Sequence, residues 1–298
     1  MPLYDRKTLS LAALLVIAGL LVISACSQAR INQNNWDRMT KTAAANEMKP
    51  VQFIAGIFQL SGMLKKTPGG HPELVVYIEG DGYTLDKRTG RLRNDPTPSY
   101  AQGLHLAVSD PAPQLLYLAR IGQFNNANVG AKYKKYWGNA RFSPEAVLAA
   151  SQAIDQTKSL TKAEKVHLVG FSGGGGLAAI LAEQRKDVAS LITVAGLLDT
   201  EWWAIEYLQH LSANGANYSH AFSLSINPAD QAESIAALPQ VHFSGSNDTN
   251  IPPQMVSQFQ KKIPFTHFQH IILPYPHNQG WTESWPRQLE LHVLPLRQ

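Results

Sequence analysis

The stretch from Lys165 to Ala182 constrains the fold more than any other part of this chain. Residues 165–171 form a short apolar run with β-branched residues, which is typical of a buried parallel strand. The residues after Gly176 are rich in Ala and Leu and predict a helix. Between them, Gly170-Phe-Ser-Gly-Gly174 matches G-x-S-x-G. Such a strand-to-helix turn needs small flanking residues, so we expect the Ser172 hydroxyl to project above a sheet.

Segments with strand and helix character alternate along most of the chain. The expected strands are 51–64 (one strand or a hairpin), 73–79, 114–119, 165–171, 188–198, 241–244 and 265–273. The expected helices are 143–156, the segment from the turn to about 185, 252–262 and 279–294, with a long loop over 84–113. The alternation predicts an α/β fold: a mostly parallel central sheet with helices on both faces.

Residues 200–239 interrupt this alternation between two expected strands. We therefore expect a small cap insertion there, above the carboxyl ends of the strands. Its Trp202-Trp203 pair is consistent both with a lid that faces lipid and with ordinary core packing.

A serine nucleophile needs a general base, and His277 is the best candidate. In parallel sheets the reactive groups gather where strands end. His277 follows the last expected strand by a few residues and precedes the last expected helix. Four competing histidines lie inside or at the start of expected strands: His167, His242, His267 and His270.

The base in turn needs an orienting carboxylate, for which we choose Asp248. It follows the strand expected at 241–244, in Gly245-Ser-Asn-Asp248. Asp beside Gly and Asn also commonly caps a turn. Asp199, at the end of the preceding strand, is the rival acid.

The order Ser172, Asp248, His277 resembles that of α/β-hydrolases, and the resemblance covers residues 52–298. The motif Tyr77-Ile-Glu-Gly-Asp-Gly82, with Leu118-Ala-Arg120 and Arg141-Phe-Ser-Pro144, is similar to a poorly characterised bacterial branch. The resemblance implies a serine hydrolase that cleaves an ester, thioester or amide through an acyl-enzyme, most simply a carboxylesterase. The same scaffold also carries peptidases, haloperoxidase-like enzymes and non-catalytic binding proteins.

The resemblance also implies an oxyanion hole. The N–H of Asp81, or that of Gly82, would pair with the N–H of Gly173. Carboxylates at 79 and 81 would oppose a developing oxyanion unless they are paired. Arg120, at the end of a neighbouring strand, is one expected partner; alternatively, Asp81 contacts a cationic group of the substrate.

The N-terminal residues predict an export signal and a lipid anchor. Arg6 and Lys7 precede an apolar run from Leu11 to Ile23, as in a signal peptide. Residues 23–26, ISAC, resemble the lipobox of bacterial lipoproteins, which implies lipidation of Cys26, the only cysteine. We expect a signal peptide over 1–25, a lipidated tether over 26–50 and the hydrolase domain over 51–298. An uncleaved anchor over 8–25 is the alternative.

Composition excludes several other classes. The formal net charge of +4 is too small to indicate nucleic-acid binding, and the lysine clusters at 132–135 and 261–262 are expected to be solvated. No H-E-x-x-H or similar spacing indicates a metal, and the expected chemistry needs no cofactor. The expected partners are a small-molecule or acyl substrate and, through Cys26, the envelope membrane. A non-acidic residue, Ser27, after the cysteine favours the periplasmic side of the outer membrane.

Overall fold

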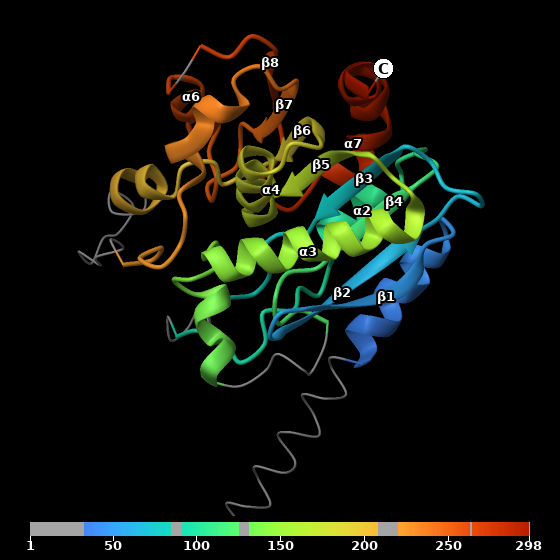
Figure 1. Cartoon of the computed structure of the whole chain (residues 1–298). Helices are drawn as coiled ribbons and strands as arrows, with labels where there is room; N and C mark the ends of the chain where they lie inside the picture. Colours follow the sequence, from blue (N-terminus) through green and yellow to red (C-terminus); the bar gives the residue numbers. More distant parts are fainter. Residues whose placement is uncertain (1–32, 85–90, 125–130, 208–219, 263, 298) are drawn as a thin grey trace, which may run out of the picture.

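The computed structural model describes residues 33–84, 91–124, 131–207, 220–262 and 264–297. Its centre is an eight-stranded sheet in the order β1-β2-β4-β3-β5-β6-β7-β8 (Figure 1). β1 pairs with β2 and β2 with β4 in antiparallel fashion, and all other neighbours are parallel. The strands are β1 (Lys49–Ala55), β2 (Phe58–Lys65), β3 (Glu73–Ile78), β4 (Leu115–Leu118), β5 (Lys165–Phe171), β6 (Val188–Val194), β7 (Gln240–Gly245) and β8 (Phe268–Leu273).

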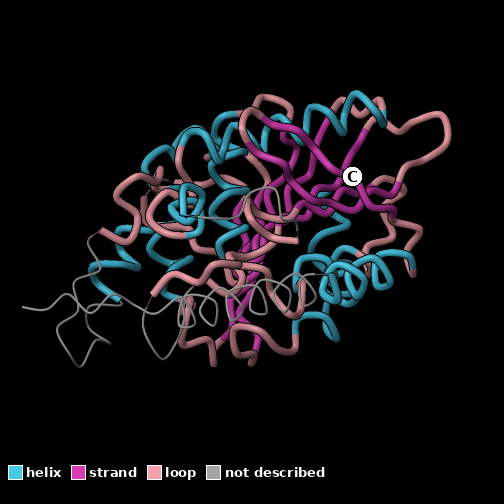
Figure 2. Tube along the Cα trace, turned by 90° about the horizontal axis from the view of Figure 1, so that it is seen from below, coloured by secondary structure: helices cyan, strands magenta, loops and turns pink. Residues whose placement is uncertain are grey.

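Helices cover both faces of the sheet, which confirms the predicted α/β class. Figure 2 shows the strands as one twisted band with helical segments on either side. Along β3, Leu74, Val76 and Ile78 enter one core, and Val75 and Tyr77 enter the other. The first core lies under α3 (Pro144–Thr161), α4 (Gly173–Gln184) and α6 (Gln254–Gln260), and the second under α2 (Gln102–Ala107) and α7 (Trp281–Gln288). This alternation explains why the central strands β3 and β4 carry apolar side chains on both faces.

Several element ends differ from the prediction for local reasons. α3 begins after Ser143, whose side chain accepts the Ala146 N–H, and continues to Thr161 rather than 156. β6 stops at Val194 because Ala195 adopts a φ of +49°. β8 begins at Phe268 rather than at 265.

The helix predicted over 279–294 is instead three short segments. α7, which contains Pro286, is followed by η4 (Leu289–Val293) and η5 (Leu294–Arg297), with π and 3₁₀ geometry. Proline has no N–H for the helical ladder, so a single regular helix is disfavoured here.

The predicted tether is wrong for residues 33–50. Residues 33–44 are helical, and Lys49 and Pro50 already belong to β1. Met39, Ala43 and Met48 are buried in the core that contains α2 and α7. The domain therefore begins before residue 51. Residues 1–25 and Cys26 lie outside the described residues, and within the described part of the chain no helix is long and apolar enough to cross a bilayer.

The described parts of the insertion contain two short helical segments, η2 (Trp202–Tyr207) and η3 (Pro228–Ile235). Trp202 and Trp203 are half-buried and pack against the first core. The Trp203 Nε1–H donates to the Asn250 carbonyl at 2.7 Å. These contacts favour the packing interpretation of the pair over a lipid-facing one.

Candidate active site

Ser172 stands on a sharp turn between β5 and α4. Its φ of +53° and ψ of −122° place it in a strained backbone region. A Cβ at Gly170 would lie 2.3 Å from the Gly174 carbonyl oxygen, and one at Gly174 would lie 2.3 Å from that of Ile78. The G-x-S-x-G glycines are thus required because backbone passes where side chains would be.

Three residues that are distant in sequence meet at the carboxyl ends of their strands. Ser172 Oγ lies 3.0 Å from His277 Nε2, and His277 Nδ1 lies 2.7 Å from Asp248 Oδ2. A carboxylate only accepts hydrogen bonds, so the ring carries its proton on Nδ1 and Nε2 can accept the serine proton. The structure therefore brings together the three side chains expected to form a relay.

Asp248 fills both roles that the sequence left open for it. Its side chain is fully buried. While Oδ2 holds His277, Oδ1 accepts the N–H groups of Asn250 and Ile251, each at 2.8 Å, as a turn-capping aspartate does. The turn therefore fixes the carboxylate that orients the imidazole.

The rival acid and two of the rival histidines lie in other networks. Asp199 accepts the Trp202 N–H at 3.0 Å and lies 3.6 Å from the Lys262 ammonium. His167 contacts Ser190, and His242 contacts Thr193, both inside the sheet.

The loop after β3 lies against the start of α4, as the predicted oxyanion hole requires. A Cβ at Gly173 would lie only 2.2 Å from Asp81 Oδ1, so the two residues are in close contact. The Gly80 carbonyl accepts the Gln123 amide at 2.9 Å. Gly82 has a φ of +71°, and a Cβ there would lie 2.1 Å from the Pro96 carbonyl oxygen. The loop is therefore tightly fixed beside the nucleophile.

Two arginines hold the Asp81 carboxylate. Arg120 Nη1 lies 3.0 Å from Oδ1, and Arg141 Nη1 lies 2.8 Å from Oδ2. Burial opposes ionisation, but Arg141 and Arg120 outweigh it and lower the pKa of Asp81 below its ordinary value. Pairing with Arg120 was one of the two expectations. Because both oxygens are occupied, the structure gives no support to the other, a substrate cation at Asp81.

Comparison with known proteins identifies the family to which the chain belongs. A family model described as serine hydrolase (FSH1) matches residues 81–277, which is more than half of the chain. The chain belongs to this serine hydrolase family. No curated protein matches the sequence of this serine hydrolase.

Solved structures support the α/β-hydrolase fold of this serine hydrolase. A Pyrococcus furiosus esterase aligns with a TM-score of 0.56 at 17% identity over 85% of this chain and 91% of that one. Est1E from Butyrivibrio proteoclasticus aligns with 0.57 at 12% identity over 83% and 98%. An acylaminoacyl peptidase from Pyrococcus horikoshii aligns with 0.60 at 15% identity over 84% of this chain but 41% of its own. At these identities the likeness shows the fold alone.

Glu79 is a buried carboxyl of this serine hydrolase whose environment the sequence did not predict. It accepts the N–H groups of Gly80 at 2.9 Å and Gly103 at 3.0 Å, and the Tyr117 hydroxyl at 3.0 Å. Burial raises the pKa of Glu79 to about 7, although these three donors favour the carboxylate. A protonated Glu79 can donate to Tyr117 instead, so both protonation states have partners.

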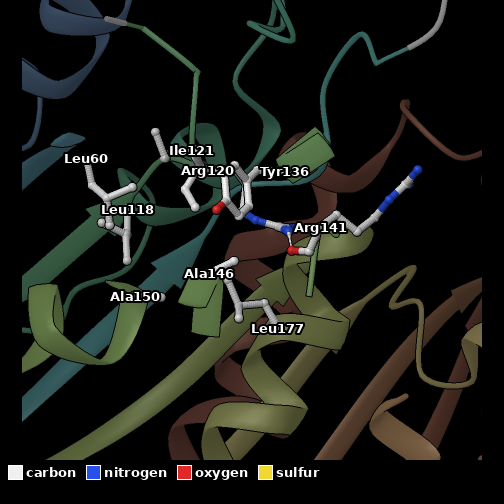
Figure 3. Close-up of a pocket in the computed structure, with 10 residues that line it drawn as sticks. Leu60, Leu118, Arg120, Ile121, Tyr136, Arg141, Ala146, Ala150 and Leu177 are labelled. Atoms are coloured by element: carbon white, nitrogen blue, oxygen red, sulfur yellow. Dashed lines mark hydrogen bonds between the residues drawn. The ribbon is translucent and has the colours of Figure 1, made fainter. Parts of the chain in front are cut away.

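Two hollows of the hydrolase lie near these groups. Beside Arg120, whose Nη2 donates to the Arg141 carbonyl at 2.7 Å, a small space of about 10 Å³ can hold no more than a water molecule (Figure 3). An open hollow of about 570 Å³ borders the loop that carries His277, at the starts of α2 and α7. Its lining is polar and aromatic: Tyr100, Gln102, Tyr275, Asn278, Gln279, Gly280, Thr282 and Glu283.

Proposed function

We propose that this serine hydrolase is a carboxylesterase that works through an acyl-enzyme on Ser172. The observation that carries the proposal is the relay from Ser172 Oγ to His277 at 3.0 Å and on to Asp248 at 2.7 Å. It places a nucleophile, a base and an orienting carboxylate in hydrogen-bond contact without any rearrangement.

In the proposed reaction, His277 Nε2 takes the proton of Ser172 as Oγ attacks the ester carbonyl carbon. Asp248 stabilises the resulting imidazolium. The carbonyl oxygen becomes an oxyanion between the N–H groups of Asp81 and Gly173, a setting in which one lost donor costs about 3 kcal/mol of transition-state stabilisation. His277 then protonates the departing alkoxide. A water molecule, deprotonated by His277, then attacks the acyl carbon. The bond from that carbon to Ser172 Oγ breaks, the acid leaves, and His277 returns the proton to Oγ.

Chain architecture favours an ester over a peptide substrate. The chain matches 91% and 98% of the two esterases but only 41% of the acylaminoacyl peptidase, so it corresponds to the full length of the former. The open hollow borders the loop that carries His277, and its mixed polar and aromatic lining suits a small alcohol leaving group.

A matched substrate pair tests the bond type. We expect p-nitrophenyl butyrate to be hydrolysed with a kcat/KM at least about 100-fold above that of butyryl p-nitroanilide, with no turnover by Ser172→Ala. Faster anilide cleavage would instead support the peptidase alternative. Absence of hydrolysis for both, with no fluorophosphonate labelling, would favour a non-catalytic protein.

We also propose that the enzyme is anchored in the bacterial envelope through a lipid on Cys26. The support is the ISAC sequence after an apolar run, all of which lies outside the described residues. Metabolic labelling with a palmitate analogue should mark the wild-type protein and not Cys26→Ser. Equal labelling of the two would contradict lipidation at this cysteine.

A further inference from the structure

The Asp81 side chain lies beside the nucleophile in an arrangement that the relay alone does not require. A Cβ at Gly173 would be 2.2–2.6 Å from the three atoms of the Asp81 carboxylate, so this group rests directly on the first residue after Ser172. Its two oxygens bind Arg120 and Arg141. We call Asp81, Arg120 and Arg141 the Asp81 cluster.

The cluster connects the loop to two rigid neighbours. Arg120 lies two residues after the end of β4, and its backbone N–H donates to the Gln123 side chain at 3.0 Å. Arg141 precedes α3, and its Nε donates to the Gly138 carbonyl at 2.8 Å. Both guanidinium groups are also stacked on aromatic rings, Arg120 over Phe142 at 5.2 Å and Arg141 over Phe222 at 4.7 Å. These contacts fix where the Asp81 side chain can lie.

We propose that the Asp81 cluster is a positioning device that holds the Asp81 backbone N–H at the oxyanion formed on Ser172. The proposal rests on the proposed acyl-enzyme function. The residues on either side of Asp81 are fixed by backbone contacts: Gly80 by Glu79 and Gln123, and Gly82 by the close approach of Pro96. At Asp81 itself, the contacts to the rest of the protein run through the side chain, and among the described residues its N–H has no backbone acceptor. The carboxylate therefore controls where this N–H points.

The negative charge of Asp81, considered alone, predicts the opposite effect of this residue on the reaction rate. A carboxylate next to Gly173 repels a developing oxyanion, so by charge alone Asp81→Asn would accelerate acylation. A positioning role predicts slower acylation. A neutral amide accepts hydrogen bonds from two guanidinium groups less strongly, so the Asp81 backbone N–H moves away from the oxyanion. The sign of the change in kcat therefore separates the two mechanisms.

The chain offers a matched control at the other end of the parallel strands, where the strands begin. Asp187, just before β6, is bound by Arg185 at 2.7 Å and by Lys158. We call these three residues the Asp187 cluster. Here too one carboxylate binds two cations, although Arg185 is shared with Asp155. The cluster lies at the amino end of β6, whereas the carboxyl end of β6 lies at the active site, where the Val194 carbonyl accepts the Ser172 N–H.

The experiment compares Asp81→Asn, Arg141→Gln, Arg141→Lys and Asp187→Asn on p-nitrophenyl butyrate. The rates are normalised to the sites that a fluorophosphonate labels at completion. We expect kcat to fall about 10–100-fold in Asp81→Asn and Arg141→Gln with KM within about threefold. Arg141→Lys should lose less, and Asp187→Asn should keep kcat within about twofold while its Tm falls.

A second readout reports the oxyanion directly. An alkyl trifluoromethyl ketone accepts the Ser172 oxygen at its carbonyl carbon, and its carbonyl oxygen becomes an anion as the serine proton passes to His277. Its inhibition constant should rise in parallel with the loss of kcat in Asp81→Asn and Arg141→Gln.

Unchanged or faster turnover in both Asp81→Asn and Arg141→Gln would overturn the positioning role. So would equal loss in Asp187→Asn. If Asp81→Asn does not fold, the two Arg141 variants decide the matter. A wild-type enzyme that neither hydrolyses the ester nor binds the ketone would instead refute the proposed function.

Discussion

The amino ends and the carboxyl ends of the parallel strands, called here the amino edge and the carboxyl edge, carry similar ion clusters in different backbone settings. At the amino edge, Asp187 binds Arg185 and Lys158, and its carbonyl accepts the Val166 N–H where β5 begins to pair with β6. At the carboxyl edge, Asp81 binds Arg120 and Arg141 in a loop pressed against the nucleophile turn. The ionic chemistry is shared, so the function of each cluster follows from the backbone that it fixes.

The residues directly after two central strands also have unusual backbone conformations. Ser172 and Ala195, directly after β5 and β6, have φ values of +53° and +49°. These conformations cost free energy, and the packing of the sheet maintains them. Lys162, just before β5 at the amino edge, also has a positive φ of +57°, but it is the left-handed C-cap of α3. Strain at Ser172 itself is consistent with a site that is held ready for reaction.

The largest contrast between the edges should come from Ser172→Ala. Without the hydroxyl no acyl-enzyme can form, so the ester hydrolysis rate should fall by about 10⁴-fold or more. The free energy of unfolding should change little, because the alanine occupies the same turn. Steady-state kinetics and urea unfolding check both halves. Residual hydrolysis within tenfold of wild type would remove Ser172 from the mechanism.

Asp248→Asn should reduce kcat by about 10³–10⁴-fold. An amide at Oδ2 can donate to His277 Nδ1, which moves the ring proton to Nε2 and leaves no acceptor for the serine. Asp199→Asn is the matched control, since Asp199 is also buried and follows β6 but contacts Trp202 and Lys262. We expect its kcat to stay within about threefold. Comparable losses in the two variants would contradict the assignment of Asp248.

Glu79 should make stability depend on pH. Its folded-state pKa of about 7 lies above the ordinary 4.5, so its stabilising contribution is complete below about pH 4.5 and is lost as the pH rises through 7. Relative to Glu79→Gln, wild-type stability should therefore fall by about 3 kcal/mol between pH 4 and pH 8. Urea unfolding of both proteins over this range measures the difference. Parallel pH profiles would show that Glu79 does not titrate in this range.

The smallest expected effect belongs to the amino edge. Asp187→Asn weakens two partly exposed ion pairs, and we expect a loss of about 1 kcal/mol in unfolding free energy with unchanged kcat. Thermal unfolding and ester hydrolysis on one preparation measure both. A loss of activity without a loss of stability would contradict the claim that the Asp187 cluster affects stability and not catalysis.

Sequence patterns predicted the parts of the site that follow from strand order. Ser172, Asp248 and His277 each follow an apolar strand, and parallel strands bring their ends to one edge. The pairing of Asp81 with Arg141 was not predictable, because the two lie 60 residues apart and share no periodic signal.

The sequence of residues 33–44 contains a helical periodicity that the polar composition of the segment obscured. Trp36, Met39 and Ala43 recur at intervals of three and four and so line one face. The polar residues between them gave the segment the character of a tether. The hydrogen-bond donors of Glu79 were not predictable from sequence, since they come from α2 and β4 as well as from its own loop.

The most direct test of the central claim is to locate the site of covalent labelling by a fluorophosphonate with peptide mass spectrometry. We expect one adduct, on Ser172, that forms on the wild-type protein, is abolished in Ser172→Ala and is strongly slowed in a His277→Ala variant. Labelling of another residue, or equal labelling of Ser172→Ala, would contradict the claim that this hydroxyl is the activated nucleophile.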